Sequence, residues 1–71
     1  MTREEINTAF QKAIEKLKDI SRTVLIMRDI EGKSYEEISC ITGLKSGTVR
    51  STLARARYQI ANELKIFRYE L

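Results

Sequence analysis

A short segment that ends in a glycine constrains this chain more than any other feature of its sequence. Residues 34–37 have the form of a capping box, in which the Ser34 hydroxyl accepts a hydrogen bond from the Glu37 amide and the Glu37 carboxylate accepts one from the Ser34 amide. A helix that begins there must be short, because Gly43 follows and glycine adopts the left-handed backbone that closes a helix. The sequence therefore predicts a helix of about two turns followed by a tight turn.

Two helices are predicted before this segment. In the first, over residues 3–17, apolar side chains recur at steps of three and four. Asp19 and Ser21 are suitable N-cap residues, so we expect a break next to them and a second helix that ends at Gly32. Residues 24–27 of the second helix are all apolar, which indicates burial on more than one face. The apolar stripe of the first helix is Ile6, Phe10, Ala13, Ile14 and Leu17.

The last and longest helix is expected to begin with Ser46 as its N-cap. Its apolar stripe is Val49, Leu53, Ala56, Ile60, Leu64 and Phe67. A short helix, a glycine turn and a longer helix, over about residues 34–64, form a helix-turn-helix, which presents its second helix to the DNA major groove. Ser39 is small where the two helices approach each other. We therefore expect one all-α, four-helix domain over residues 1–71, without a sheet.

Composition excludes several classes of function. The 71 residues include one cysteine, Cys40, and no histidine, so no intrachain disulfide, structural zinc set or imidazole-activated nucleophile is available. The adjacent acids Glu36 and Glu37 are explained by a helix N-terminus. We expect no enzyme, cofactor, metal site or small-molecule substrate. Because no apolar run is long enough to cross a membrane, the chain is expected to be soluble and cytoplasmic.

Positive charge is concentrated in one part of the chain, although the net charge is only +3. Residues 1–31 contain six basic and six acidic side chains, whereas residues 43–57 contain no acid and four cations: Lys45, Arg50, Arg55 and Arg57. This excess indicates a nucleic-acid surface, although charge alone does not exclude chance clustering on a solvated face. We expect Arg57, which is closest to the apolar stripe, to pair with an acid of a neighbouring helix. The candidates are Asp29, Glu31 and Glu37.

Individual roles follow from the helical wheel and from side-chain chemistry. Thr48, Ser51 and Arg55 lie opposite the apolar stripe of the last helix. Arg50 has the planar fork that binds guanine O6 and N7, and the two hydroxyls are suited to a base edge or a phosphate. Lys45 and Arg55 are interpreted as phosphate contacts. The first amides of the helix, at the positive end of its dipole, form a further phosphate site.

Residues from Leu17 to Arg57 closely resemble region 4 of bacterial RNA polymerase sigma factors of the extracytoplasmic-function group. The runs that carry the resemblance are RTVLIMRDIEGKSYEEI (22–38), GTVRS (47–51) and RAR (55–57). In that family, region 4 is a helix-turn-helix that reads the −35 promoter element and also docks on the flap of the polymerase β subunit. The resemblance implies sequence-specific promoter binding during transcription initiation. By position, the resemblance implies that the promoter is read by Thr48, Arg50, Ser51 and Arg55, with backbone support near Arg28 and Lys45. With Ser46, the DNA-binding set is Arg28, Lys45, Ser46, Thr48, Arg50, Ser51 and Arg55.

The chain departs from the pattern of that family at several positions. Lys18 stands where proline is usual, and Lys45 also occupies a frequent proline position. Thr52 replaces a frequent basic residue, and Ala54 replaces a larger side chain. The family's second DNA-binding domain, which melts the −10 element, has no counterpart among these residues. We therefore interpret the chain as an excised or separately encoded region 4.

Two alternative interpretations stay open. The output domain of a two-component response regulator shares the four-helix scaffold and a Thr-Val pair, but the GTVRS and RAR runs favour a sigma factor. A protein-interaction module is the other alternative, in which polymerase or an anti-sigma factor binds the central helix or an apolar C-terminal end. That end comprises Phe67, Tyr69 and Leu71. Salt dependence separates DNA binding from protein interaction, because binding to phosphates weakens with salt and binding through an apolar surface does not.

Overall fold

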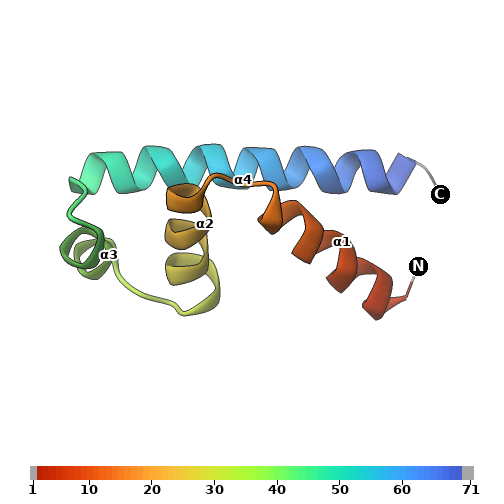
Figure 1. Cartoon of the computed structure of the whole chain (residues 1–71), viewed down its shortest axis with the longest axis horizontal. Coiled ribbons are helices and arrows are strands. Elements are labelled where there is room, and N and C mark those ends of the chain that lie inside the picture. The colour runs from red at the N-terminus through yellow and green to blue at the C-terminus, as the bar shows by residue number, and fades with distance from the viewer. Residues whose placement is uncertain (1, 70–71) are drawn as a thin grey trace.

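The computed structural model describes the backbone of residues 2–69 and the side chains of residues 2–65. In this part of the chain the elements are α1 (Arg3–Glu15), α2 (Asp19–Leu25), the π-helical turn η1 (Ile26–Ile30), α3 (Tyr35–Thr42) and α4 (Ser46–Tyr69). All are helical, so the all-α prediction is confirmed. The long α4 extends along the molecule, and α3, α2 and α1 follow one another beside it (Figure 1).

The helix α1 is anchored at both ends by different means. At its start, the Thr2 hydroxyl accepts a hydrogen bond from the Glu5 amide at 3.1 Å. Toward its end, Ala13 and Ile14 are buried. Ile6 is 47% exposed, so the prediction that it belongs to the buried stripe is wrong. The reason is that α1 diverges from α4 toward its N-terminus, which leaves its first turns uncovered (Figure 1).

The connection between α1 and α2 differs from the predicted break. Lys18 is the N-cap of α2 and makes no side-chain cap hydrogen bond. Asp19 and Ser21 therefore lie inside α2, and the prediction that one of them caps it is wrong. A guanidinium closes the connection instead, because Arg22 donates to the Leu17 carbonyl at 3.1 Å.

The second helix widens before it reaches its glycine. In η1 the Glu31 amide donates to the Ile26 carbonyl at 2.9 Å, which is the five-residue spacing of a π-turn. The Lys33 amide donates to the Met27 carbonyl at 2.9 Å, and Gly32 has a φ of 73°. Gly32 therefore ends the helix as predicted, but the wide turn before it was not predicted.

The capping box at the start of α3 is confirmed. The Glu37 amide donates to the Ser34 hydroxyl, and the Ser34 amide donates to the Glu37 carboxylate, both at 3.0 Å. The backbone hydrogen bond from Ser34 is the main cause that lowers the pKa of Glu37. The helix is eight residues long, and Gly43 follows it with a φ of 76°. Both the short helix and the left-handed turn were predicted.

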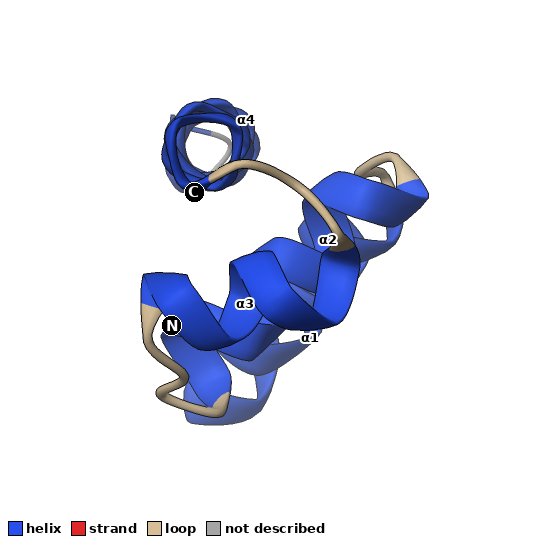
Figure 2. Ribbon diagram, turned by 90° about the vertical axis from the view of Figure 1, so that its left-hand side faces the viewer, coloured by secondary structure: helices blue, strands red, loops and turns tan. Residues whose placement is uncertain are grey.

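The hydrophobic core is built along one side of α4. Its largest fully buried side chains are Ile38, Leu53, Val24 and Val49. Ala56 and Ile60 extend the same cluster along α4. Viewed along α4, the other helices lie to one side of it (Figure 2). The predicted stripe is confirmed through Ile60, Leu64 is half-buried, and the side chain of Phe67 lies outside the described residues.

Candidate nucleic-acid interface

The side of α4 that faces away from the core is polar. This outer face consists of Thr48, Ser51, Arg55, Tyr58 and Asn62, all of them exposed as the helical wheel predicts. The Ser51 hydroxyl donates to the Thr48 carbonyl at 3.1 Å, which leaves the lone pairs of its oxygen available as acceptors. Arg55 supplies donors on the same face. The outer face therefore offers both donors and acceptors to a ligand.

Most of the predicted basic stretch keeps its charge unneutralised. Among the described side chains, Lys45, Arg50 and Arg55 have no acidic partner. Arg57 differs, because its Nε donates to Asp29 at 2.9 Å and a second guanidinium nitrogen contacts the other carboxylate oxygen. The hydrogen bond from Arg57 is the main cause that lowers the pKa of Asp29. The predicted ion pair of Arg57 is thus confirmed, with Asp29 as its partner.

Tyr35 forms an aromatic platform beside the start of α4. The guanidinium carbon of Arg28 lies 4.6 Å from the centre of the Tyr35 ring, and that of Arg50 lies 4.9 Å from it. Arg28 also donates to the Lys33 carbonyl at 2.8 Å. These contacts hold two arginines from different elements against one ring by cation–π attraction. The sequence analysis did not single out Tyr35 as a residue that binds arginine; its place at the first position of α3 was the available signal.

The turn between α3 and α4 is fixed by side-chain hydrogen bonds. Ser39 donates to the Leu44 carbonyl, and Thr42 donates to the Ile38 carbonyl at 2.7 Å. The Leu44 amide in turn donates to the Thr42 hydroxyl at 3.2 Å. Ser39 was predicted only as a small residue, but its hydroxyl also closes the turn. These bonds, together with Gly43, set the direction in which α4 leaves α3.

The first turn of α4 begins one residue earlier than predicted. Ser46 is already the first residue of α4, and the Lys45 carbonyl accepts the first bond, from Val49 at 2.9 Å. The prediction that Ser46 is the N-cap is therefore wrong by one position. Lys45, Ser46, Gly47 and Thr48 are all exposed. The amides of this first turn precede the helical hydrogen-bond ladder, so they are available to an anion.

Other kinds of site find no support in the described residues. No group of three or more potential ligands that could hold a metal ion occurs among them. Cys40 is a free, exposed thiol. Among residues 2–69, no helix combines the length and the apolar character that crossing a bilayer requires.

Comparison with known proteins agrees with this geometry. The family model described as sigma-70, region 4 matches residues 7–60. The chain is 40% identical over 65 residues to the RNA polymerase sigma-H factor of Pseudomonas aeruginosa, which covers 92% of this chain and 34% of that protein. It is 44% identical over 54 residues to the ECF RNA polymerase sigma factor SigE of Mycolicibacterium smegmatis, which covers 76% of this chain and 21% of that protein.

A third relative is the ECF RNA polymerase sigma-E factor of Escherichia coli K12, which is 38% identical over 65 residues and matched over 92% of this chain and 34% of its own length. The chain thus spans a third or less of the length of these relatives. No solved structure matches it significantly. The family match covers the capping box, the glycine turn and the outer face of α4 as far as Tyr58. The chain belongs to the sigma-70 region 4 family, the DNA-binding helix-turn-helix domain of RNA polymerase sigma factors.

Proposed function

We propose that this chain recognises the −35 element of bacterial promoters by placing the outer face of α4 in the DNA major groove. The observation that carries the proposal is that this face is polar, free of acids and held out by α3 and the Gly43 turn. Residues 46–57 extend about 18 Å at 1.5 Å per residue, which suits a groove about 12 Å wide. Such a domain binds DNA and fixes the position of the protein on it; it catalyses no reaction.

The base-reading role belongs to side chains at the start of α4. Arg50 has the fork that recognises guanine, and the Tyr35 ring restrains it beside the first turn. Thr48 and Ser51 meet base edges from the outer face. Restraint before binding reduces the side-chain entropy that is lost on contact, which favours the proposed role of Arg50.

The phosphate contacts lie around these base-reading residues. Lys45 and Arg55 are exposed cations without acidic partners in the described part of the chain. Ser46 and the first amides of α4 add uncharged donors, and Arg28 adds a cation from the Tyr35 platform. Contacts of this kind fix the orientation of the helix in the groove and carry no sequence information.

The relatives named above are RNA polymerase sigma factors, and by extension we assign this chain a role in directing polymerase to promoters in the cytoplasm. Two exposed apolar side chains suit docking on the polymerase β flap or on an anti-sigma factor. Ile30 on η1 is 59% exposed and Ile41 on α3 is 56% exposed. Replacement of both by serine is expected to weaken binding to a β-flap fragment at every salt concentration. Unchanged binding would contradict this assignment of the docking surface.

The salt dependence of duplex binding tests the proposal. With three or four phosphate contacts, the logarithm of the binding constant should fall with the logarithm of the salt concentration with a slope of about −3. Fluorescence anisotropy with a labelled −35 duplex measures this slope. A slope near zero would contradict DNA binding and favour the protein-interaction alternative.

Two variants separate base reading from phosphate contact. Arg50→Ala is expected to cost about 1–3 kcal/mol on the preferred duplex and to relax the preference at one base pair. Lys45→Ala should weaken binding to all duplexes alike and make the salt slope shallower by about 1. If both variants lose affinity equally on preferred and scrambled duplexes, the assignment of Arg50 to a base is wrong.

A further inference from the structure

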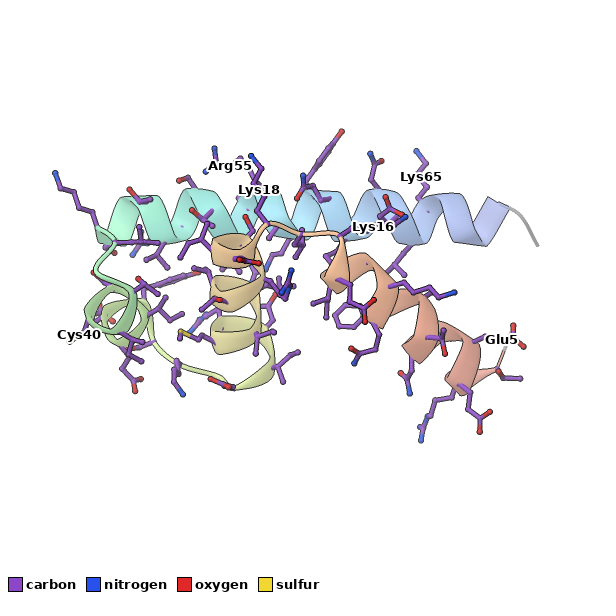
Figure 3. All side chains as sticks on the ribbon, in the orientation of Figure 1. Glu5, Lys16, Lys18, Cys40, Arg55 and Lys65 are labelled. Atoms are coloured by element: carbon purple, nitrogen blue, oxygen red, sulfur yellow. The ribbon has the colours of Figure 1, made fainter. Side chains whose placement is uncertain are left out.

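A polar hollow lies beside the outer face of α4, where the α1–α2 connection meets that helix. Its volume is about 330 Å³. It is lined by Lys18, Ile20, Ser21, Thr52, Arg55 and Gln59. Figure 3 shows the side chains of Lys18 and Arg55 projecting past α4 next to each other, although they come from segments far apart in the sequence. We call this site the Lys18 hollow.

The charge of the Lys18 hollow is positive and unneutralised. Two of its lining residues are cations and none is an acid. Within the described residues, neither the side chain of Lys18 nor that of Arg55 forms an ion pair or a hydrogen bond. The neighbouring acid Asp19 instead contacts Arg22 at 3.4 Å. Two like charges beside one hollow repel each other, and an anion between them removes this repulsion.

Thr52 adds a hydrogen-bonding group to the Lys18 hollow. The residue is only 4% exposed, yet its hydroxyl has no hydrogen-bond partner in the part of the chain that the structure describes. It lines the Lys18 hollow. Because the Thr52 hydroxyl opens onto a cationic hollow, it can donate a hydrogen bond to an acceptor oxygen from outside the chain.

The position of the Lys18 hollow relates it to a duplex. Arg50 and Thr52, which lines the Lys18 hollow, lie about 160° apart around α4 at 100° per residue, on opposite sides of the outer face that includes Arg55. Arg50 borders the Tyr35 platform, and Arg55 borders the Lys18 hollow. A helix in the major groove has one phosphate backbone on each side. The platform and the hollow would therefore face opposite strands.

We propose that the Lys18 hollow holds a phosphate of the DNA backbone on the strand opposite the Tyr35 platform. Lys18 and Arg55 supply the charge, and the hydroxyls of Ser21 and Thr52 supply hydrogen bonds. The inference rests on the proposed function and adds a contact from outside the helix-turn-helix. In this proposal Lys18 helps to orient the domain on DNA and does not read bases.

Removal of the Lys18 charge tests this contact. In anisotropy titrations with the labelled −35 duplex, Lys18→Gln should make the salt slope shallower by about 0.9, the value for one phosphate contact. Affinity should fall by the same factor on preferred and scrambled duplexes, and Lys18→Arg should restore both quantities. The matched control is Lys12→Gln on α1, which removes the same charge from an exposed side chain and should leave the slope unchanged.

The result that overturns the inference differs from the one that overturns the proposed function. If Lys18→Gln behaves like Lys12→Gln while Lys45→Ala still reduces the slope, the hollow does not contact DNA. If the unmodified chain binds no duplex in a salt-dependent way, the proposed function itself fails. Circular dichroism of Lys18→Gln verifies the fold, since Lys18 is exposed and makes no cap hydrogen bond.

A free anion is the other source of the same chemistry, and a separate titration distinguishes it. The duplex should shift the amide resonances of Lys18, Ser21 and Thr52, whereas inorganic phosphate at the same ionic strength as a chloride control should not. Saturating shifts with inorganic phosphate alone would contradict the duplex assignment and identify a free-phosphate site.

Discussion

At the scale of single residues, the arginines of α4 differ in the groups that they contact. Arg57 pairs with Asp29 on η1, Arg50 lies over the Tyr35 ring, and Arg55 lines the Lys18 hollow. Their positions on the helical wheel explain the difference, because Arg57 is nearest the apolar side and Arg55 is farthest from it. One guanidinium therefore joins α4 to η1, whereas Arg55 remains on the outer face and Arg50 lies at its side.

Replacement of Asp29 by Asn should lower the free energy of unfolding at neutral pH. It should also make the decrease of that free energy in acid smaller. Arg57 holds the pKa of Asp29 below its ordinary value of 3.8, so the unfolded chain takes up the proton more readily. The contribution of the pair is complete well above pH 3.8. It declines as the pH falls through 3.8 and is lost below the lowered pKa of the folded chain.

Urea unfolding at pH 7 and pH 3 measures this contribution. Because the pair is partly exposed, we expect Asp29→Asn to cost at most about 1 kcal/mol at pH 7, and less at pH 3. Some acid sensitivity should persist in the variant, since the pKa of Glu37 is also lowered by its capping bonds. A loss of equal size at both pH values would contradict the role assigned to Asp29.

At the scale of elements, the features that depend on residues close in sequence were predicted and those that depend on packing were not. The capping box joins Ser34 to Glu37, and Gly43 needs only its own positive φ, so the local sequence indicates both. The π-turn η1 was missed. Its wide turn distributes the apolar run, with Val24 and Leu25 buried and the next two residues half-buried. That distribution depends on α3, which packs against η1, and on α4, which packs against α2.

Two glycine substitutions test the turn that orients α4. Gly43→Ala should destabilise the chain by about 1–2 kcal/mol, because the φ of 76° is unfavourable for a residue with a Cβ. An added Cβ would meet no atom within 4 Å, so the cost comes from the backbone alone. Gly47→Ala is the matched control and should stabilise α4 by up to about 1 kcal/mol, since Gly47 has helical backbone and open space.

Urea denaturation of the two variants shows whether each substitution raises or lowers the free energy of unfolding. A loss of stability at Gly43 and a gain at Gly47 are expected. No loss on Gly43→Ala would contradict the left-handed turn between α3 and α4, and with it the orientation of the outer face.

At the scale of the whole molecule, one side of α4 packs in the core and the opposite side is the proposed DNA-binding face. The molecule measures 41 × 18 × 15 Å, and α4 lies along its longest dimension (Figure 1). The outer face could be predicted because it follows from the period of a single helix. The Tyr35 platform and the Lys18 hollow could not, because tertiary packing alone brings the start of α3 and the α1–α2 connection to α4.

The central claim is that the outer face of α4 enters a duplex, and amide chemical-shift mapping tests it most directly. Contacts of this size give dissociation constants of about 10⁻⁴ to 10⁻⁶ M at physiological salt, a range in which such titrations remain informative. With a −35 duplex, we predict shifts over residues 45–57 and at Lys18, and smaller shifts over residues 45–57 with a scrambled duplex. Shifts confined to α1 or to the exposed side of α3, with α4 unaffected, would contradict the claim.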